Sequence, residues 1–87
     1  MSRYRIDYTP RAIKQLRAIR DARTGNPIKQ AIQRLAIDPR HTGVTKLVDA
    51  DDEWRVRVGD WRIVYRIDDE VLVVLVVKVA PRGEVYR

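Results

Sequence analysis

Apolar and polar residues follow a strand period at the start of the chain and a helical period directly after it. Residues 3–8 (RYRIDY) alternate between apolar and charged positions, as in a half-buried strand. Thr9-Pro10 has the residue types of a helix N-cap and a first helical position. A helix is therefore predicted here, with an apolar stripe made of Ala12, Ile13, Leu16 and Ile19.

A second helix is predicted between Gly25 and Asp38. Gly25 is expected to end the first helix, and Asn26-Pro27 repeats the cap-and-proline pattern. Asp38-Pro39 is expected to end the second helix, because the residue before a proline avoids helical geometry. The apolar stripe of this helix consists of Ile28, Ala31, Ile32 and Leu35.

Strand patterns occupy the rest of the chain. Residues 54–58 and 61–67 alternate on either side of a turn, residues 71–80 form a long apolar strand, and residues 46–48 form a short one. Both faces of residues 71–77 are apolar, which predicts a central strand. We expect a single domain over residues 1–87. The predicted fold class is α+β, with two N-terminal helices packed on one face of a small antiparallel twisted sheet.

Composition and net charge indicate what kind of protein the chain is, where it is located and what partner it binds. Hydrophobic residues make up 45% of the 87 residues and charged residues 34%, which favours a globular chain. Cysteine is absent, which excludes disulfides and thiolate chemistry and favours a cytoplasmic location. Neither a signal peptide nor a membrane span is expected, because no apolar segment follows Met1 and the longest apolar run is short. The net charge of +6 favours a polyanionic partner, either nucleic acid or an acidic protein.

The stretch EWRVRVGDWRIVYR (residues 53–66) predicts a hairpin that concentrates positive charge. Gly59 stands where a type II′ turn needs glycine, so a two-residue loop sets the register. Arg57 then lies opposite Arg62, and like charges so placed destabilise a sheet by part of the ~0.2–1 kcal/mol that such pairs carry. Four arginines share the face away from the helices, with no acidic residue expected among them. This arginine face consists of Arg55, Arg57, Arg62 and Arg66.

Two interpretations of the arginine face are open at this point. It can be the solvated side of an amphipathic hairpin, which protects the sheet against aggregation. It can also be an anion site, because guanidinium groups bind phosphate through bidentate, charge-assisted hydrogen bonds. The number of arginines favours the anion site. Val73 and Leu75 of the apolar strand are expected to form a wall beside it.

Three segments together resemble the RelE/ParE superfamily of toxins from toxin–antitoxin modules. They are the hairpin WRVRVGDWRIVYRI, the tail PRGEVYR, and the DPR…G…KL residues between Asp38 and Leu47. The resemblance covers nearly the whole chain, from Tyr4 to Tyr86, and implies the RelE-like fold. RelE-like members are ribosome-dependent endoribonucleases that cut mRNA in the A site. ParE-like members share the fold, poison DNA gyrase and generally lack the nuclease residues.

The resemblance also implies roles for individual residues. RelE-like toxins carry basic residues before the hairpin turn, an arginine after it, another after the last strand, and a tyrosine near the terminus. All these positions are matched here, which favours the nuclease branch. The implied catalytic residues are Arg57, Arg62, Arg82 and Tyr86. The implied RNA-binding residues are Arg55, Arg66 and Lys46.

The implied reaction is attack of a ribose 2′-oxygen on the adjacent phosphate, which leaves a 2′,3′-cyclic phosphate and a 5′-hydroxyl. In this hypothesis Arg62 grips the scissile phosphate and Arg57 supports it. Arg82 faces the leaving 5′-oxygen, as general acid or as electrostatic support. Tyr86 stacks on a base or orients the 2′-hydroxyl.

The chain departs from the family pattern at the pre-hairpin positions. They are typically lysine in the best-known RelE-like enzymes, whereas this chain has arginine, which keeps its proton in proteins. No general base is therefore identified, and the candidates are Tyr86, Glu84 and His41. The alternative is that the ribosome and the distortion of the mRNA lower the barrier without a protein base.

The remaining polar and aromatic residues are expected to have structural roles. His41 is expected in a loop, and Trp54 and Trp61 are expected to pack against the helices. No metal site or cofactor is expected, because the acidic residues of 49–53 fit a solvated loop better. The basic residues of the helices are expected to be solvated or to touch ribosomal RNA backbone, and they are Lys14, Arg17, Arg20, Lys29 and Arg34.

The sequence therefore favours a RelE-like toxin that cleaves mRNA on the ribosome, with a cognate antitoxin protein, the ribosome and mRNA as partners and no membrane. A gyrase poison without nuclease activity is the alternative within the superfamily. A small basic module that binds RNA or protein without catalysis is the alternative from another class.

Overall fold

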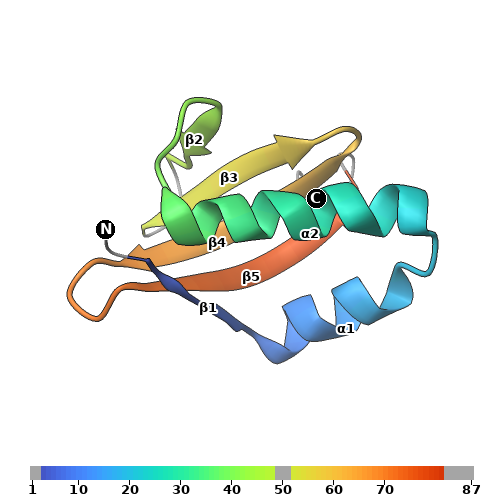
Figure 1. Ribbon diagram of the computed structural model, residues 1–87, viewed down its shortest axis with the longest axis horizontal. Helices are drawn as coiled ribbons and strands as arrows, with labels where there is room; N and C mark the ends of the chain where they lie inside the picture. Colours follow the sequence, from blue (N-terminus) through green and yellow to red (C-terminus); the bar gives the residue numbers. More distant parts are fainter. Residues whose placement is uncertain (1–2, 49–51, 82–87) are drawn as a thin grey trace.

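The computed structural model describes residues 3–48 and 52–81, which form two helices and one sheet (Figure 1). In chain order the elements are β1 (Arg5–Tyr8), α1 (Pro10–Ala18), α2 (Ala22–Ile37), β2 (Val44–Lys46), β3 (Glu53–Val58), β4 (Trp61–Asp68) and β5 (Val73–Pro81). In the sheet the five strands lie in the order β1-β5-β4-β3-β2.

Both helices begin at capping residues, but α2 begins earlier than predicted. Thr9 caps α1 as expected, and its side chain also bonds to the sheet. Asp21 caps α2 by accepting a hydrogen bond of 3.1 Å from the backbone N–H of Arg23. Gly25 lies inside the first turn of α2, so the predicted helix end at Gly25 and restart at Asn26-Pro27 are wrong. The Asp21 cap starts the helix first, and the proline inside it removes one helical hydrogen bond near the exposed amino end.

The sheet is mixed, whereas a fully antiparallel sheet was predicted. β1 runs parallel to β5, and the other three strand pairs are antiparallel. Alternation of residue types identifies a strand but not its direction. The connection from β1 to β5 contains both helices, and a connection of this kind permits parallel pairing. β5 has β1 on one side and β4 on the other, so the prediction of a central strand is confirmed.

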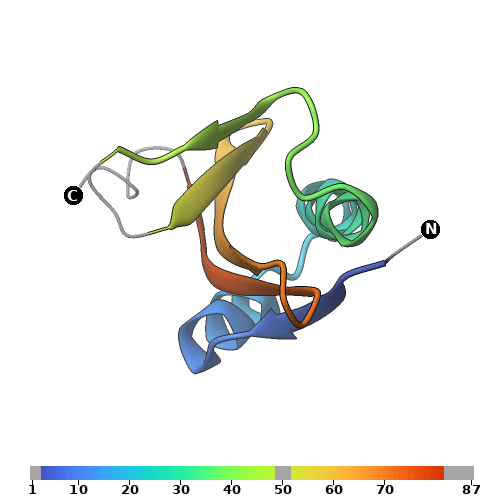
Figure 2. The same cartoon turned by 90° about the vertical axis from the view of Figure 1, so that its left-hand side faces the viewer.

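One hydrophobic core lies between the helices and the sheet. Figure 2 shows the sheet curling around α2, which is seen nearly end-on. The predicted helix stripes supply Ala12, Ile28, Ile32 and Leu35. The strands supply Val56, Ile63, Tyr65, Val74, Val76 and Val79. Trp54 and Trp61 pack against this core, as predicted, so the opposite face of the sheet is left for function.

A buried hydrogen bond ties the loop after α2 to the sheet. The side chain of Tyr65 is fully buried, and its hydroxyl donates to the carbonyl oxygen of Pro39 at 2.7 Å. Burial raises the pKa of Tyr65, so the phenol stays protonated and remains a donor. The contact fixes the chain direction after the predicted helix end at Asp38-Pro39.

Asp69 joins three segments that are distant in sequence. Its carboxylate accepts a bidentate pair of hydrogen bonds from Arg40, at 3.0 and 2.8 Å. It also accepts a hydrogen bond of 2.6 Å from the hydroxyl of Tyr4. The hydrogen bonds from Arg40, which have the larger effect, and the one from Tyr4 lower the pKa of Asp69 from its ordinary 3.8 to about 2. The turn between β4 and β5 is thus linked to β1 and to the loop after α2.

The substitution Asp69→Asn is expected to weaken the dependence of stability on acid pH. Because the folded-state pKa is below the unfolded value, Asp69 stabilises the fold above pH 3.8 and loses this effect as pH falls toward 2. The melting temperature of the wild type, followed from about pH 5 to about pH 2, should therefore fall more steeply than that of the variant. Equal slopes in the two proteins would contradict this role. The exposure of the bridge also predicts that added salt reduces the difference.

Candidate functional site

The predicted register of the hairpin is confirmed, and it produces the arginine face. Val58 lies opposite Trp61, and Arg57 lies directly opposite Arg62. Gly59 has a φ of +57°, whereas Asp60 does not have a positive φ, which fits the predicted type II′ turn. Paired residues of an antiparallel ladder share a face, so the two arginines lie side by side on the surface away from the helices.

The arginines of this face differ in exposure. Arg57 is exposed, whereas Arg62 is only 1% exposed. Two neighbours of Arg62 on the same face, Val64 and Ala80, are also buried. The centre of the arginine face is therefore covered, and Arg57 lies at its open rim. Arg55, on the same strand as Arg57, is half-buried.

Arg66 lies next to an acidic residue, contrary to the prediction that none shares this face. Glu53 belongs to β3 rather than to a loop, and it lies directly opposite Arg66. The two side chains form an ion pair at 3.3 Å. A carboxylate in contact with the guanidinium offsets its charge, so the anion-binding capacity of Arg66 is reduced relative to Arg57.

Lys46 is not brought to the arginine face. It lies opposite Trp54, whose ring packs on the helix side of the sheet. Its ammonium group is 5.9 Å from the centroid of the Trp54 ring, and the guanidinium of Arg40 is 5.4 Å from the same centroid. Both distances fit cation–π contacts. Lys46 is thus placed beside an aromatic platform at the edge of the sheet.

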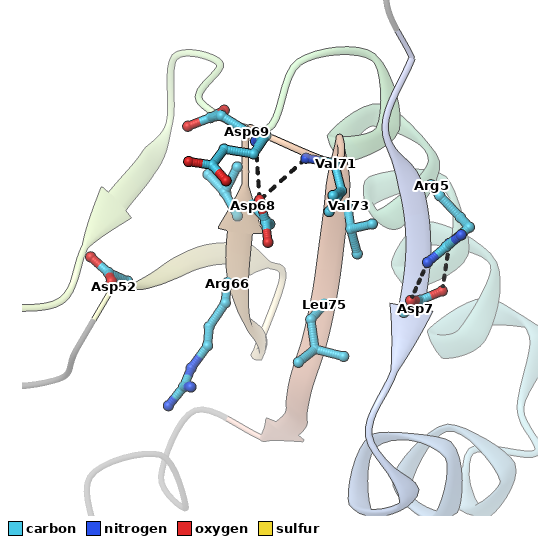
Figure 3. Close-up of a pocket in the computed structure, with 11 residues that line it drawn as sticks. Arg5, Asp7, Asp52, Arg66, Asp68, Asp69, Val71, Val73 and Leu75 are labelled. Atoms are coloured by element: carbon cyan, nitrogen blue, oxygen red, sulfur yellow. Dashed lines mark hydrogen bonds and ion pairs between the residues drawn. The ribbon is translucent and has the colours of Figure 1, made fainter.

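A pocket of about 830 Å³ lies at the end of the sheet near the turn between β4 and β5. Figure 3 shows Arg66, Val73 and Leu75 lining it, so the predicted apolar wall is beside one arginine of the face. The same pocket has an acidic rim made of Asp7, Asp52, Asp68, Asp69 and Glu70. Arg5, which also lines it, pairs with Asp7 at 3.1 Å. The predominance of carboxylates makes this end of the face a poor site for a phosphate.

Lys78 also lies on the arginine face, a position that the sequence pattern does not predict. Strict alternation from the buried residues Val74 and Val76 would turn Lys78 toward the helices. In the structure Lys78 lies opposite Val64, because β5 has a bulge between Val76 and Lys78. No sequence signal marks the bulge, so the placement is visible only in the structure.

Of the other candidate residues, His41 is the one within the described part of the chain. His41 is in a loop, as predicted, and its Nδ1 is 2.7 Å from the carbonyl oxygen of Thr42. Arg82, Glu84 and Tyr86 are outside the described residues, so their predicted roles stay predictions. Within residues 3–48 and 52–81, no group of three or more acidic or histidine side chains could hold a metal ion. No helix in that part of the chain is long and apolar enough to cross a membrane.

The helical layer carries a charge equal to that of the whole chain. Residues 10–37 contain seven lysines and arginines but one acidic residue, a net charge of +6. The rest of the chain contains eleven residues of each sign. Because α1 and α2 cover the core side of the sheet, this basic surface lies on the side of the molecule opposite the arginine face.

Comparison with known proteins identifies the same superfamily as the sequence motifs. The family model of the ParE toxin of type II toxin–antitoxin systems matches residues 6–86. No curated protein matches the sequence.

Solved structures share the fold over nearly the whole chain. The isolated RelE toxin of E. coli is 29% identical, with a TM-score of 0.79, over 95% of this chain and 90% of that one. The RelE–RelB complex of Pyrococcus horikoshii contains a chain that is 27% identical, with a TM-score of 0.76, over 95% of this chain and 98% of that one. A YoeB/ParE toxin of Agrobacterium tumefaciens, 20% identical over 88% and 96% of the two chains, has a TM-score of 0.76 and shows the shared fold alone. The chain belongs to the ParE toxin family of type II toxin–antitoxin systems, within the RelE/ParE superfamily.

Proposed function

We propose that this toxin is a RelE-like, ribosome-dependent endoribonuclease that cuts mRNA in the A site. The observation that carries the proposal is the direct pairing of Arg57 and Arg62 on the sheet face opposite the core. This pairing costs stability, and it produces a local concentration of guanidinium groups that suits a phosphate. The similarity to E. coli RelE over most of both chains supports the same activity.

In the proposed reaction the ribose 2′-oxygen attacks the adjacent phosphorus, and the bond to the 5′-oxygen breaks. Arg57, which is exposed, and Arg62, which is only 1% exposed and must be uncovered when RNA binds, stabilise the charge that develops on the phosphoryl oxygens. This is the contribution of an oxyanion hole. Arg55 and Arg66 contact neighbouring backbone with smaller effect, the latter because Glu53 pairs with it. Arg82 and Tyr86 are proposed to act on the leaving oxygen and on the base or 2′-hydroxyl.

The basic helical layer provides a separate surface for the partners of the toxin. In this proposal its positive charge holds the protein against ribosomal RNA backbone while the arginine face meets the mRNA. An acidic segment of a cognate antitoxin is proposed to cover these basic surfaces when the toxin is inactive. The RelE–RelB complex among the similar structures supports an antitoxin partner.

The direct test is primer extension on mRNA threaded into programmed ribosomes, with free mRNA as the control. We expect cuts within the A-site codon, ends bearing a 2′,3′-cyclic phosphate, and no cutting of free mRNA. Intact mRNA on ribosomes to which the folded protein is bound would contradict the proposal.

The second candidate is a gyrase poison, because the family model that matches residues 6–86 is that of the ParE toxin. Inhibition of supercoiling by purified gyrase, together with intact mRNA on ribosomes, would select this function. Inhibition of neither process would favour a non-catalytic binding module.

A further inference from the structure

We propose that Lys78 is a phosphate-binding residue of the arginine face and contacts the RNA backbone beside Arg62. The inference rests on the proposed ribonuclease function and adds to it a residue that neither the sequence motifs nor the family likeness indicated. It follows from the irregularity in β5 and from the distribution of charge over the sheet face.

The β-bulge determines where Lys78 points. Ile63 pairs with Val79 and Tyr65 pairs with Val76, so two residues of β5, Val77 and Lys78, face the single residue Val64 of β4. The extra residue changes the alternation, and Lys78 joins Val64 on the side away from the helices. Bulges of this kind commonly re-aim a side chain next to a functional site.

Contacts from α1 and its cap hold the backbone of the bulge in place. β1 ends at Tyr8, and beyond it Thr9 donates a hydrogen bond of 3.0 Å from its hydroxyl to the carbonyl oxygen of Val77. The side chain of Gln15 accepts a hydrogen bond of 2.7 Å from the backbone N–H of Val79. The backbone on either side of Lys78 is therefore bonded to the helical layer, and its direction is fixed.

The sheet face divides into a cationic half and a mixed half. The cationic half consists of two rows of paired residues across the strands, Arg57–Arg62–Ala80 and Arg55–Val64–Lys78. These rows contain four basic residues and no acidic one. The next rows are Glu53–Arg66–Leu75–Asp7 and Asp68–Val73–Arg5, in which carboxylates outnumber the arginines.

Lys78 is the basic residue that β5 contributes to the cationic half, whose arginines all lie on β3 and β4. It is separated from Arg55 by one strand, a distance of about 10 Å between backbones, and it is next to the row that contains Arg62. Lys78 is half-buried, and within the described part of the chain it forms no ion pair with a carboxylate. An ammonium group binds phosphate as a compact point charge, so it can hold a phosphate beside the one that the arginine fork grips.

The test compares Lys78→Met with Lys78→Arg and with Arg3→Met, which removes an exposed basic residue outside both the arginine face and the helical layer. The probe is a short RNA oligonucleotide with 2′-O-methyl groups, which cannot be cleaved through the 2′-oxygen, and binding is followed by fluorescence anisotropy over a range of salt concentrations. Lys78→Met should weaken binding about three- to tenfold and reduce the salt slope by about 0.7, the value for one phosphate contact on a single strand. Lys78→Arg should restore binding, and Arg3→Met should have a smaller effect than Lys78→Met. Cleavage on programmed ribosomes is measured with the same proteins.

The outcomes separate this inference from the proposed function. If the oligonucleotide does not bind the wild type, or binds Lys78→Met as tightly as the wild type, the assignment of Lys78 is wrong even if mRNA is cleaved. If binding depends on Lys78 but the wild type leaves ribosomal mRNA intact, the phosphate site stands and the nuclease function is wrong. Loss of binding in both Lys78→Met and Lys78→Arg would point to disturbed structure and would also overturn the assignment.

Discussion

Arg62→Met is expected to slow cleavage of A-site mRNA by about 10²–10³-fold, the usual loss when one donor to a developing negative charge is removed. Arg62 is the most buried charged residue of the described face, at 1% exposure, and lies between Arg57 and Ala80 on the neighbouring strands. Its guanidinium is thus held in one place, and a fixed donor stabilises a transition state better than a mobile one. The measurement is single-turnover cleavage on programmed ribosomes.

Two further variants make this prediction specific. Arg62→Lys keeps the charge but loses the planar fork, so we expect an intermediate rate. Arg66→Met removes an arginine from the same face of the same strand, but Glu53 already pairs with it, so we expect less than about a tenth of the Arg62→Met effect. Equal losses for Arg62→Met and Arg66→Met would mean that general positive charge, rather than Arg62, supports cleavage. Circular dichroism and melting curves check that each variant is folded.

Leu35→Ala is expected to lower the free energy of unfolding by about 2–5 kcal/mol. The side chain of Leu35 is fully buried, and it belongs to the core that also contains Ile63 and Tyr65 of β4. Truncation removes apolar burial and leaves a cavity between α2 and the sheet. A loss of this size corresponds to a fall in melting temperature of roughly 8–40 °C for a domain of this length.

Ile37→Ala is the matched control for this stability prediction. Ile37 is in the last turn of the same helix, but the residue is 57% exposed. We expect a change of less than about 1 kcal/mol, because little apolar surface and no cavity is involved. Similar losses for the two variants, measured by urea denaturation, would show that the helix itself rather than the core contact determines stability.

Short-range patterns in the sequence were sufficient to predict the register of the hairpin and the helix residues that form the core. Gly59 sets a two-residue turn, and from that turn onward the alternation of residues places Arg57 opposite Arg62. Spacing within each helix likewise identified Leu35 and the other buried residues of α1 and α2. In these cases the determining residues are a few positions apart, so the sequence contains all the required information.

Competition between nearby signals made two predicted helix boundaries wrong, the end of α1 and the start of α2. Gly25 and Asn26-Pro27 have the residue types of a helix end and a new start, but Asp21 caps α2 four residues before Gly25. Either interpretation satisfies the local preferences. Ile28 and Leu35 lie in the helix in both interpretations, so their packing on the sheet does not decide the start. The hydrogen bond from the backbone N–H of Arg23 to the side chain of Asp21 favours the earlier start.

The sequence by itself determined the family, the arginine face and the two-layer arrangement of helices and sheet. Only the tertiary structure decided the parallel pairing of β1 with β5, the ion pair between Arg66 and Glu53, and the turning of Lys78 onto the arginine face. The physical reason is that the alternation of apolar and polar residues depends only on positions within one strand. Strand direction, cross-strand partners and bulges depend on the neighbouring strand and on contacts such as those of Thr9 and Gln15, which lie more than sixty residues away in sequence.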